Sequence, residues 1–186
     1  MRLIITRHGE TIENKLGIHQ GQSIPGILSE EGIKQAEKLA QRLSSEKIDI
    51  IYTSDLNRAY HTAKIVHEKH PSALLIISEK LRERSYGSSE GKKDTEIKLV
   101  DMPDVESEDN LMKRAKEIID EIIYSGYENV LAVTHGGFHS ELVGNILGYS
   151  FNQLSELRGV KNTAITIFNP FPNMKLYGCY EHLSSQ

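Results

Sequence analysis

Hydrophobic and polar residues follow two rhythms along this chain, and each rhythm predicts one type of element. Short apolar runs, typical of strands, occur at residues 3–5, 48–52, 73–77 and 130–133. Between and after them, apolar residues recur every three or four positions, which predicts amphipathic helices near residues 29–43, 54–66, 111–122 and 138–147. Strand and helix therefore alternate, which predicts a three-layer α/β/α sandwich with a mostly parallel central sheet.

The helix starts and the end of the chain refine this picture. Ser29 precedes Glu30 and Glu31, the residue types that favour a helix N-terminus, and Ser54 is a second candidate N-cap. Two late extended segments, residues 164–168 and 175–180, are joined by a turn rich in proline. With no linker, repeat or low-complexity tract in sight, we expect one domain over residues 1–186, with the charged stretch 88–109 as a surface excursion near the mouth of the site.

Composition excludes several classes of partner. The 22 Lys and Arg residues face 26 Asp and Glu residues, a formal charge of −4, and the longest cationic run is Lys92-Lys93. We therefore expect no nucleic-acid partner. The longest apolar stretch, residues 73–77, is far shorter than the roughly 20 residues of a membrane span, so we expect no membrane partner either. A lone Cys179 and the lack of an Asn-x-Ser/Thr acceptor predict a reducing, cytoplasmic setting.

Candidate chemistry gathers where the predicted strands end. In open parallel α/β sheets, ligands bind beyond the carboxyl ends of the strands. The four strands run into chemically active side chains or are followed closely by them, in the order Arg7-His8, Arg58, Arg82-Glu83-Arg84 and His135-Gly136-Gly137. Two arginines with histidine suit a tetrahedral dianion such as phosphate. A histidine can then act as nucleophile and a carboxylic acid can protonate the leaving oxygen, so the residues predict phosphoryl transfer without a metal.

Each of these residues also has a simpler interpretation. A lone histidine at a strand end is often structural, Arg58 could be a solvated helix residue, and Glu83 could be a surface carboxylate. Because these side chains converge at successive strand ends, a functional interpretation of the set is favoured over a structural one. Competing motifs are incomplete: residues 87–93 are one residue short of a P-loop and lack its Ser or Thr, and Cys179 lacks the arginine of a cysteine-phosphatase loop. His135 and His139 have the spacing of a zinc pair, but Gly136 stands where a glutamate is needed.

The segment Arg7-His8-Gly9-Glu10-Thr11 resembles the R-H-G-E-T signature of the histidine phosphatase superfamily, also called phosphoglycerate mutase-like. Further segments resemble that family in the same order: Asn14 with Gln20-Gly21, residues 28–36, residues 54–63, and residues 133–137. The resemblance implies a metal-independent phosphomonoester hydrolase that needs no cofactor and acts on a small-molecule phosphomonoester.

The resemblance also implies roles for individual residues. His8 would be the nucleophile and form a phosphohistidine, while Glu83 would protonate the leaving alkoxide and then activate water, with Glu10 as a weaker substitute. Arg82 and Arg84 flank Glu83 and would lower the pKa of its carboxyl group, unless an extended backbone points them away. The phosphate would be held by a set of residues lining the pocket: Arg7, Arg58, His135, Asn14, Gln20, Gly21 and Gly136.

Phosphatase and mutase are separated by a few departures from the mutase pattern. Residues 83–87 resemble the mutase segment E-R-x-Y-G, in which the positions of Arg84 and Tyr86 contact the sugar acid. However, this chain has no Arg-Arg pair, has Gly137 where mutases tend to have Asn, and has a short insertion that leaves an open pocket. Pro103, Glu106, Ser107 and Arg114 resemble a further family segment, P-x-G-E-S…R, with Val105 in place of its Gly.

We therefore expect a phosphatase, with a cofactor-dependent phosphoglycerate mutase as the first alternative and a non-catalytic phosphate-binding module as the second. The substrate stays open among phosphorylated sugars or sugar acids, fructose bisphosphate, nucleoside or cobalamin-precursor phosphates and phosphoprotein. The protein could be a monomer or a homodimer.

Overall fold

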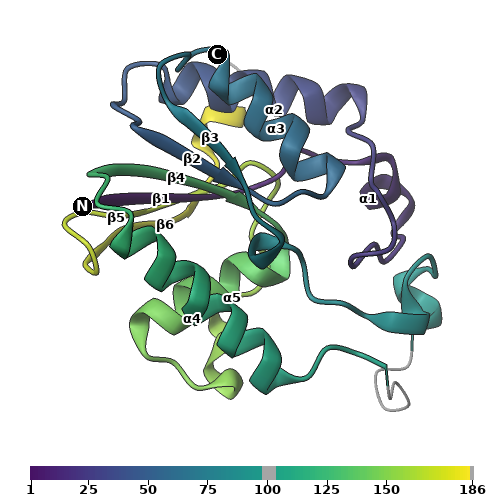
Figure 1. Ribbon diagram of the computed structural model, residues 1–186. Helices are drawn as coiled ribbons and strands as arrows, with labels where there is room; N and C mark the ends of the chain where they lie inside the picture. The colour runs from purple at the N-terminus through teal and green to yellow at the C-terminus, as the bar shows by residue number, and fades with distance from the viewer. Residues whose placement is uncertain (98–103, 185–186) are drawn as a thin grey trace.

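A six-stranded sheet forms the centre of the protein, in the strand order β3-β2-β4-β1-β5-β6 (Figure 1). The structure is a computed structural model and describes residues 1–97 and 104–184. The strands have the following bounds: β1 Arg2–Arg7, β2 Ile50–Thr53, β3 Leu74–Ile77, β4 Asn129–Thr134, β5 Ile165–Phe168 and β6 Met174–Cys179. All six lie within two residues of the predicted positions.

The first four strands in chain order are parallel, which confirms the predicted mostly parallel sheet. β1 pairs with β4, β4 with β2, and β2 with β3, all in parallel, while β5 runs antiparallel to β1 and β6 antiparallel to β5. In this register Arg7 lies opposite Thr134, and Thr53 lies opposite Val133. The ends of β1, β2 and β4 therefore meet at one edge of the sheet.

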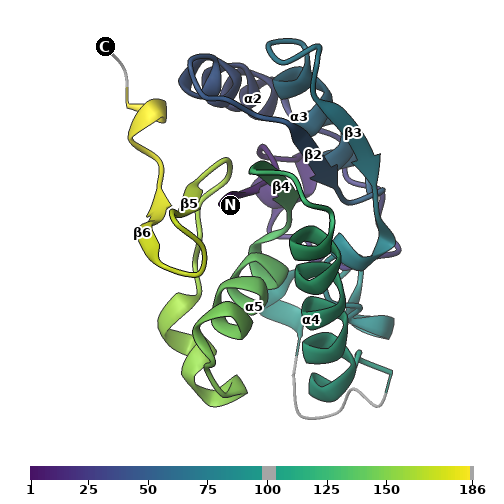
Figure 2. The same cartoon turned by 60° about the vertical axis from the view of Figure 1, so that its left-hand side comes forward.

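Helices cover both faces of the sheet and complete the three layers (Figures 1 and 2). On one face lie α2 (Glu30–Leu43) and α3 (Asn57–His67), and on the other lie α4 (Glu108–Tyr124) and α5 (Gly136–Leu147). The short elements are α1 Ile12–Leu16, η1 Glu79–Leu81, η2 Gly87–Ser89, η3 Asp94–Glu96, η5 Phe151–Leu157 and η6 Glu181–Leu183. No helix of the described ranges is long and apolar enough to cross a membrane.

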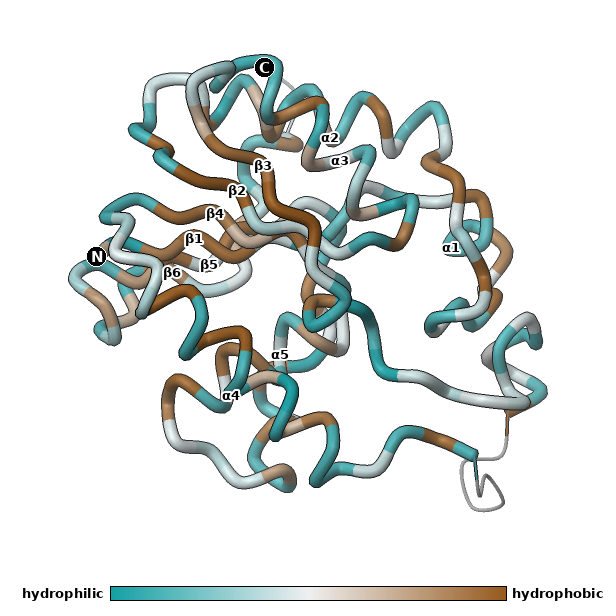
Figure 3. Tube along the Cα trace, viewed as in Figure 1, coloured by the Kyte–Doolittle hydropathy of each residue, from teal (hydrophilic) through white to brown (hydrophobic). Residues whose placement is uncertain are grey.

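The apolar core lies on the two faces of the sheet, as the alternation of side chains along a strand requires. Leu3 and Ile5 of β1 join the cluster under α4 and α5, whereas Ile4 joins the cluster under α2 and α3. β1, β2, β3 and β4 appear mostly brown in Figure 3, whereas teal and brown alternate along α2 and α4. β3 is an edge strand, and its Leu74 and Ile77 are half exposed.

Three helix starts differ from the sequence-based prediction. α4 begins at Glu108, three residues earlier than expected, with Ser107 as its N-cap. α3 begins at Asn57 with Leu56 as its N-cap, and Ser54 instead uses its Oγ to accept the Leu56 N–H at 3.2 Å. α5 begins at Gly136, two residues earlier than expected, with His135 as its N-cap. The helix therefore starts directly at the end of β4, which aims its N-terminal N–H groups at the edge of the sheet where the candidate residues gather.

The described part of the 88–109 excursion is fixed against the loop at residues 18–23. Gly91 donates its N–H to the His19 carbonyl at 2.8 Å, and His19 donates to the Lys92 carbonyl at 2.8 Å. The Glu90 carboxylate accepts the backbone N–H groups of Gln22, Ser23 and Tyr86. The two segments thus form one wall beside the candidate site. Pro103, which the sequence analysis singled out, lies outside the described residues.

Candidate active site

A polar cavity of about 160 Å³ lies next to the end of β1. Its lining residues come from distant parts of the chain and include most of the predicted phosphate-binding set: Arg7, His8, Asn14, Ile18, His19, Gln20, Gly21, Arg58 and Glu83. The fold therefore brings together the residues that the ends of the strands had suggested. Ile18 and His19 are additions that the sequence analysis did not name.

The hydrogen bonds of His8 determine which ring nitrogen carries the proton. Nδ1 lies 2.7 Å from the carbonyl oxygen of Gly9, which can only accept a hydrogen bond. Nδ1 is therefore protonated, and the lone pair is on Nε2. The backbone on either side is held as well, because the Gly9 N–H donates to Thr62 Oγ1 at 3.0 Å and Asn162 Nδ2 donates to the His8 carbonyl at 3.0 Å.

His135 has the opposite tautomer. Arg58 Nε, always a donor, lies 3.1 Å from His135 Nδ1, so Nδ1 accepts and the proton is on Nε2. His135 is fully buried, and its Nε2 has no hydrogen-bond partner among the described residues. Its ring centroid lies 5.3 Å from that of His8. The two imidazoles therefore combine an available lone pair with an available N–H group.

Burial and positive charge keep both imidazoles neutral. Burial is the largest cause and lowers the pKa of both His8 and His135 well below the usual value, and Arg58 lowers both further. Burial also lowers the pKa of Arg58 to about 10, while the charge of Glu83 raises it. Arg58 consequently stays protonated at neutral pH, so the cavity holds cationic arginines beside neutral histidines.

Both arginines are anchored by backbone carbonyl groups. Arg58 donates to Gly21 O at 2.7 Å and to Ile24 O at 3.0 Å, and Arg7 donates to Val160 O at 2.7 Å. The buried Nε of Arg7 and Oε1 of Gln20 have no hydrogen-bond partner within the part of the chain that the structure describes. A guanidinium has five N–H donors. Both arginines therefore keep donors for an anion in the cavity.

Glu83 is held by the N-terminus of α5. Its carboxylate accepts the N–H groups of Gly137 at 3.0 Å, Phe138 at 2.9 Å and Arg84 at 3.0 Å. The N-terminus of α5 is thus directed at the glutamate, and the orientation of its N–H groups favours a negative charge there. A Cβ atom on Gly137 would lie 2.7 Å from Glu83 Oε1, so this close approach requires glycine.

The arginines that flank Glu83 point elsewhere, as an extended segment allows. Arg82 Nε donates to both carboxylate oxygens of Asp55, at 2.8 and 3.1 Å, and Arg84 Nε donates to the Glu106 carbonyl at 2.9 Å. Glu10, the substitute acid, accepts from Ser29 Oγ at 2.8 Å and lies 3.5 Å from Lys15 Nζ. Glu10 is thus engaged at the start of α2, whereas Glu83 lines the cavity.

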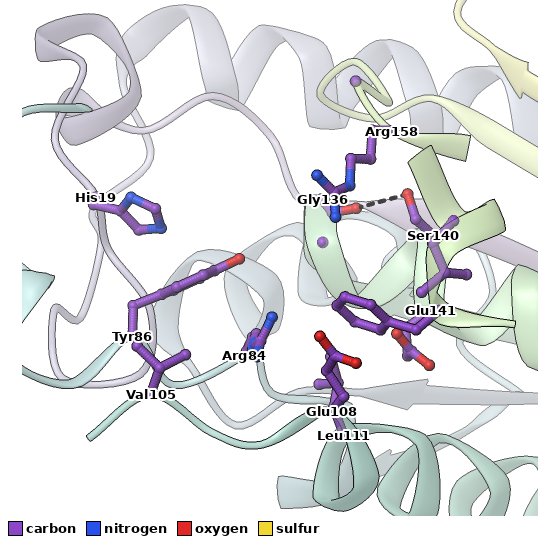
Figure 4. A pocket seen from close by; sticks show the side chains of 14 residues that line it. His19, Arg84, Tyr86, Val105, Glu108, Leu111, Gly136, Ser140, Glu141 and Arg158 are labelled. Carbon is purple, nitrogen blue, oxygen red and sulfur yellow. Dashed lines mark hydrogen bonds between the residues drawn. The ribbon is translucent and has the colours of Figure 1, made fainter. Parts of the chain in front are cut away.

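A second cavity of about 600 Å³ adjoins the first, and His19 lines both (Figure 4). Three predicted site residues, Arg84, Tyr86 and Gly136, line this larger cavity, so the structure separates them from the small polar cavity. Its walls mix charged, aromatic and aliphatic residues: His19, Arg84, Tyr86, Val105, Glu108, Leu111, Gly136, Gly137, Ser140, Glu141, Phe151, Leu154, Arg158 and Gly159.

The sequence analysis missed the segment 160–163, which supports His8 from behind. Val160 accepts from Arg7, and Asn162 donates to the His8 carbonyl. Thr163 donates its N–H to the Arg7 carbonyl at 3.0 Å and has a φ of 55°, which is unusual for a β-branched residue. No sequence signal marked this irregular segment. Thr62, by contrast, belonged to a recognised motif but had been given no role.

Comparisons with known proteins agree with this geometry. The histidine phosphatase superfamily (branch 1) matches residues 3–176. A protein of Hydrogenobacter thermophilus named "Putative phosphoserine phosphatase 2" is 32% identical over 180 residues, covering 89% of this chain and 87% of its own. The adenosylcobalamin/alpha-ribazole phosphatase of Escherichia coli is 29% identical over 80% of each chain.

A solved structure shows the same fold. The mycobacterial glucosyl-3-phosphoglycerate phosphatase in complex with VO3 has a TM-score of 0.82 and 26% identity, over 94% of this chain and 95% of its own. The three relatives are named for three different phosphorylated compounds. The chain belongs to the histidine phosphatase superfamily, and its relatives and neighbouring structures mark it as a phosphatase enzyme.

Proposed function

We propose that the protein is a metal-independent phosphomonoester hydrolase that works through a phosphohistidine on His8. The observation that carries this proposal is the pair of opposite tautomers: Gly9 leaves the lone pair of His8 on Nε2, and Arg58 leaves a free N–H on His135 Nε2. A neutral imidazole nucleophile beside an N–H donor is suited to attack on a phosphorus atom whose oxygens need stabilisation.

In the first step, the phosphoryl group occupies the small cavity, with its oxygens near Arg7 and Arg58, which line it. His135 does not line this cavity, but it is buried beside His8 and would direct its Nε2–H at the same group. The lone pair of His8 Nε2 forms a bond to phosphorus while the bond from phosphorus to the ester oxygen breaks. The Glu83 carboxylic acid gives its proton to the departing alkoxide, so the alcohol leaves neutral. Donors already aimed at the phosphoryl oxygens stabilise the charge of the transition state without reorganisation.

In the second step, water takes the place of the alcohol. The Glu83 carboxylate accepts a proton from the water as its oxygen bonds to phosphorus, and the bond between phosphorus and His8 Nε2 breaks. Inorganic phosphate leaves and His8 returns to its neutral form. The adjoining cavity of about 600 Å³ supports hydrolysis, because it gives water room to enter after the alcohol departs.

The sharpest test is to trap the intermediate. We expect a Glu83→Gln variant, mixed with a phosphate-labelled aryl phosphate and quenched in alkaline detergent, to retain label on His8, because the bond between phosphorus and imidazole nitrogen survives in alkali and breaks in acid. The wild-type enzyme should hydrolyse the same ester in EDTA, and His8→Ala should abolish both label and hydrolysis. His61→Ala, which removes an exposed histidine of α3, is the matched control. Full activity in His8→Ala would rule out the nucleophile.

Two other outcomes would replace the proposal. Interconversion of 3-phosphoglycerate in the presence of a bisphosphoglycerate primer, at a rate above hydrolysis, would make the protein a mutase, and its absence rejects that alternative. Binding of inorganic phosphate with neither label nor hydrolysis would make it a phosphate-binding module.

A further inference from the structure

Glu141 is a buried acid that the proposed reaction does not use. It lies on α5, one turn after Gly137, lines the larger cavity and is only 3% exposed (Figure 4). Among the described residues, its carboxylate has neither a hydrogen bond nor an ion pair within 4.0 Å. Buried carboxylates are almost always paired, because burial without a partner costs free energy. This one therefore has an acceptor that nothing in the fold satisfies.

The charges around Glu141 leave it ionised at neutral pH. Burial raises its pKa to about 6, and the charges of Arg84 and Arg114 oppose that rise from a distance. Arg84 donates from its Nε to the Glu106 carbonyl, and it forms no hydrogen bond with Glu141 among the described residues. The carboxylate therefore faces the cavity as an ionised acceptor without a donor of its own.

The rest of the cavity is suited to an organic group. Phe151 and Leu154 provide apolar surface. Arg84 and Arg158 provide positive charge (Figure 4). The cavity begins beside the small polar cavity, because Gly137 lines it and also donates to Glu83. Whatever is esterified to a phosphate at His8 would extend in this direction, past Glu83 and toward Glu141.

We propose that Glu141 is a specificity-determining residue, which accepts a hydrogen bond from an O–H or N–H donor on the leaving group of the phosphomonoester. This inference rests on the proposed function and adds a requirement to it: the preferred substrate carries a hydroxyl or ammonium group at a set distance from the ester oxygen. A ligand that fills the cavity without such a donor would leave this carboxylate without a partner, so the site would discriminate against that ligand.

The helix gives the scale of the substrates to test. Glu141 follows Gly137 by four residues, so the two backbone positions are separated by roughly 6 Å along the helix axis. A chain that advances about 1.2 Å per bond covers a similar length with about five bonds. We therefore choose esters with four carbon atoms between the ester oxygen and the donor.

The test uses three esters of nearly equal shape: 4-aminobutyl, 4-hydroxybutyl and pentyl phosphate. We expect wild-type kcat/KM for the two donor-terminated esters to exceed that for pentyl phosphate by about 10-fold or more. In Glu141→Leu this ratio should fall to near 1. In Glu141→Gln the preference for the hydroxyl should persist, because the amide oxygen still accepts, while the preference for the ammonium group should fall.

The controls distinguish a failure of this inference from a failure of the proposed function. Glu121→Gln changes an acid of α4 outside this cavity and should keep the wild-type ratios. Equal kcat/KM for all three esters in the wild type, or an unchanged ratio in Glu141→Leu, would overturn the inference alone. Failure of the wild type to hydrolyse any of them, or an aryl phosphate, would overturn the proposed function. Should Glu141→Leu not fold, the ammonium-to-hydroxyl ratio of Glu141→Gln decides.

Discussion

The guanidinium of Arg114 donates to both carboxylate oxygens of Glu106, from Nε at 3.0 Å and from a terminal nitrogen at 2.7 Å. The same group donates to the carbonyls of Lys80 at 3.0 Å, Arg82 at 2.7 Å and Glu83 at 3.3 Å. Arg114 thus ties α4 to the segment that carries Glu83, and Glu106 holds the guanidinium in place. Bidentate pairs of this kind fix geometry as well as adding energy.

Arg114→Met is therefore expected to lower both stability and turnover. The variant leaves Glu106 unpaired and removes the donors for the carbonyls near Glu83, a loss of about 3 kcal/mol for a pair that is more than four-fifths buried. A displaced Glu83 should lower kcat for an aryl phosphate more than it raises KM. Urea unfolding and steady-state kinetics measure the two effects.

The control for Arg114 is the exposed pair between Lys80 and Glu121, at 3.0 Å. Lys80→Met should change stability by less than about 1 kcal/mol and leave kcat unchanged. Arg114→Lys should recover part of the stability and little of kcat, since one ammonium cannot serve the same set of acceptors. An Arg114→Met enzyme with wild-type kcat would show that Arg114 does not position Glu83.

The tautomer of His135 leads to a second prediction. His135→Ala should lower kcat by about 10²- to 10³-fold, because the site loses a donor aimed at the phosphoryl oxygens. His135→Gln can place an amide N–H near the former position of Nε2, so it should retain more activity than the alanine variant. Stopped assays with an aryl phosphate compare the kcat values of the two variants. Equal losses of kcat would contradict the role of His135 as an N–H donor.

A third prediction concerns acid. His139 is fully buried, stacks on Tyr177 with ring centroids 6.1 Å apart, and has a pKa that burial lowers to about 3. Between pH 6.5, its ordinary pKa, and about pH 3, this histidine is protonated in the unfolded chain and neutral in the folded chain. Stability from this group is therefore complete above pH 6.5 and falls as the pH drops, by about 1.4 kcal/mol per unit.

Urea unfolding of the wild type and of His139→Leu measures that contribution. Between about pH 5.5 and 4, the free energy of unfolding should fall less steeply in the variant. Above pH 7 the two slopes should agree, because the histidine is neutral in both the folded and the unfolded chain there. Parallel slopes across the acid range would show that His139 is protonated in the folded protein.

A fourth prediction concerns the contact between α2 and the loop that carries His8. A Cβ atom on Gly32 would lie 1.9 Å from the Glu10 carbonyl oxygen, and both groups are backbone. Gly32→Ala should destabilise the protein by about 2–3 kcal/mol and lower activity as the loop shifts. Glu31→Ala, an exposed neighbour in the same turn, should cost only about 0.3–1 kcal/mol. Thermal unfolding compares them, and equal losses would argue against a steric cause.

Much of the site could be predicted because parallel strands bring their ends to one edge. His8 and His135 each follow a strand directly, so the apolar pattern already implied that they lie at the same edge of the sheet. The pairing of β1 with β4, which makes them neighbours, came from the structure. Arg58, one turn into the following helix, could be placed by the same reasoning. The resemblance added roles to these residues, and the geometry around them is consistent with those roles.

The remaining features of the site depend on side-chain and backbone contacts, which the spacing of apolar residues along the chain does not indicate. The contact between the start of α5 and Glu83 could not be predicted, because it depends on α5 starting early enough for the N–H groups of Gly137 and Phe138 to reach the carboxylate. Asn162 could not be found, since its segment has no pattern and its partner lies at the other end of the chain. Glu141 was part of a predicted helix, and only packing shows that its side chain faces the cavity.

The place of β1 in the sheet has a consequence for how the protein is made. β1 carries Arg7 at its end and is synthesised before its two neighbours in the sheet, β4 and β5, which lie more than 120 residues further along the chain. The centre of the sheet therefore cannot close until β5 has been synthesised. Pairing across such long sequence separations slows folding and leaves the early apolar strands exposed in the meantime. A nascent chain that stops short of β5 would contain His8 but could not catalyse, so activity appearing during translation would report completion of the whole sheet.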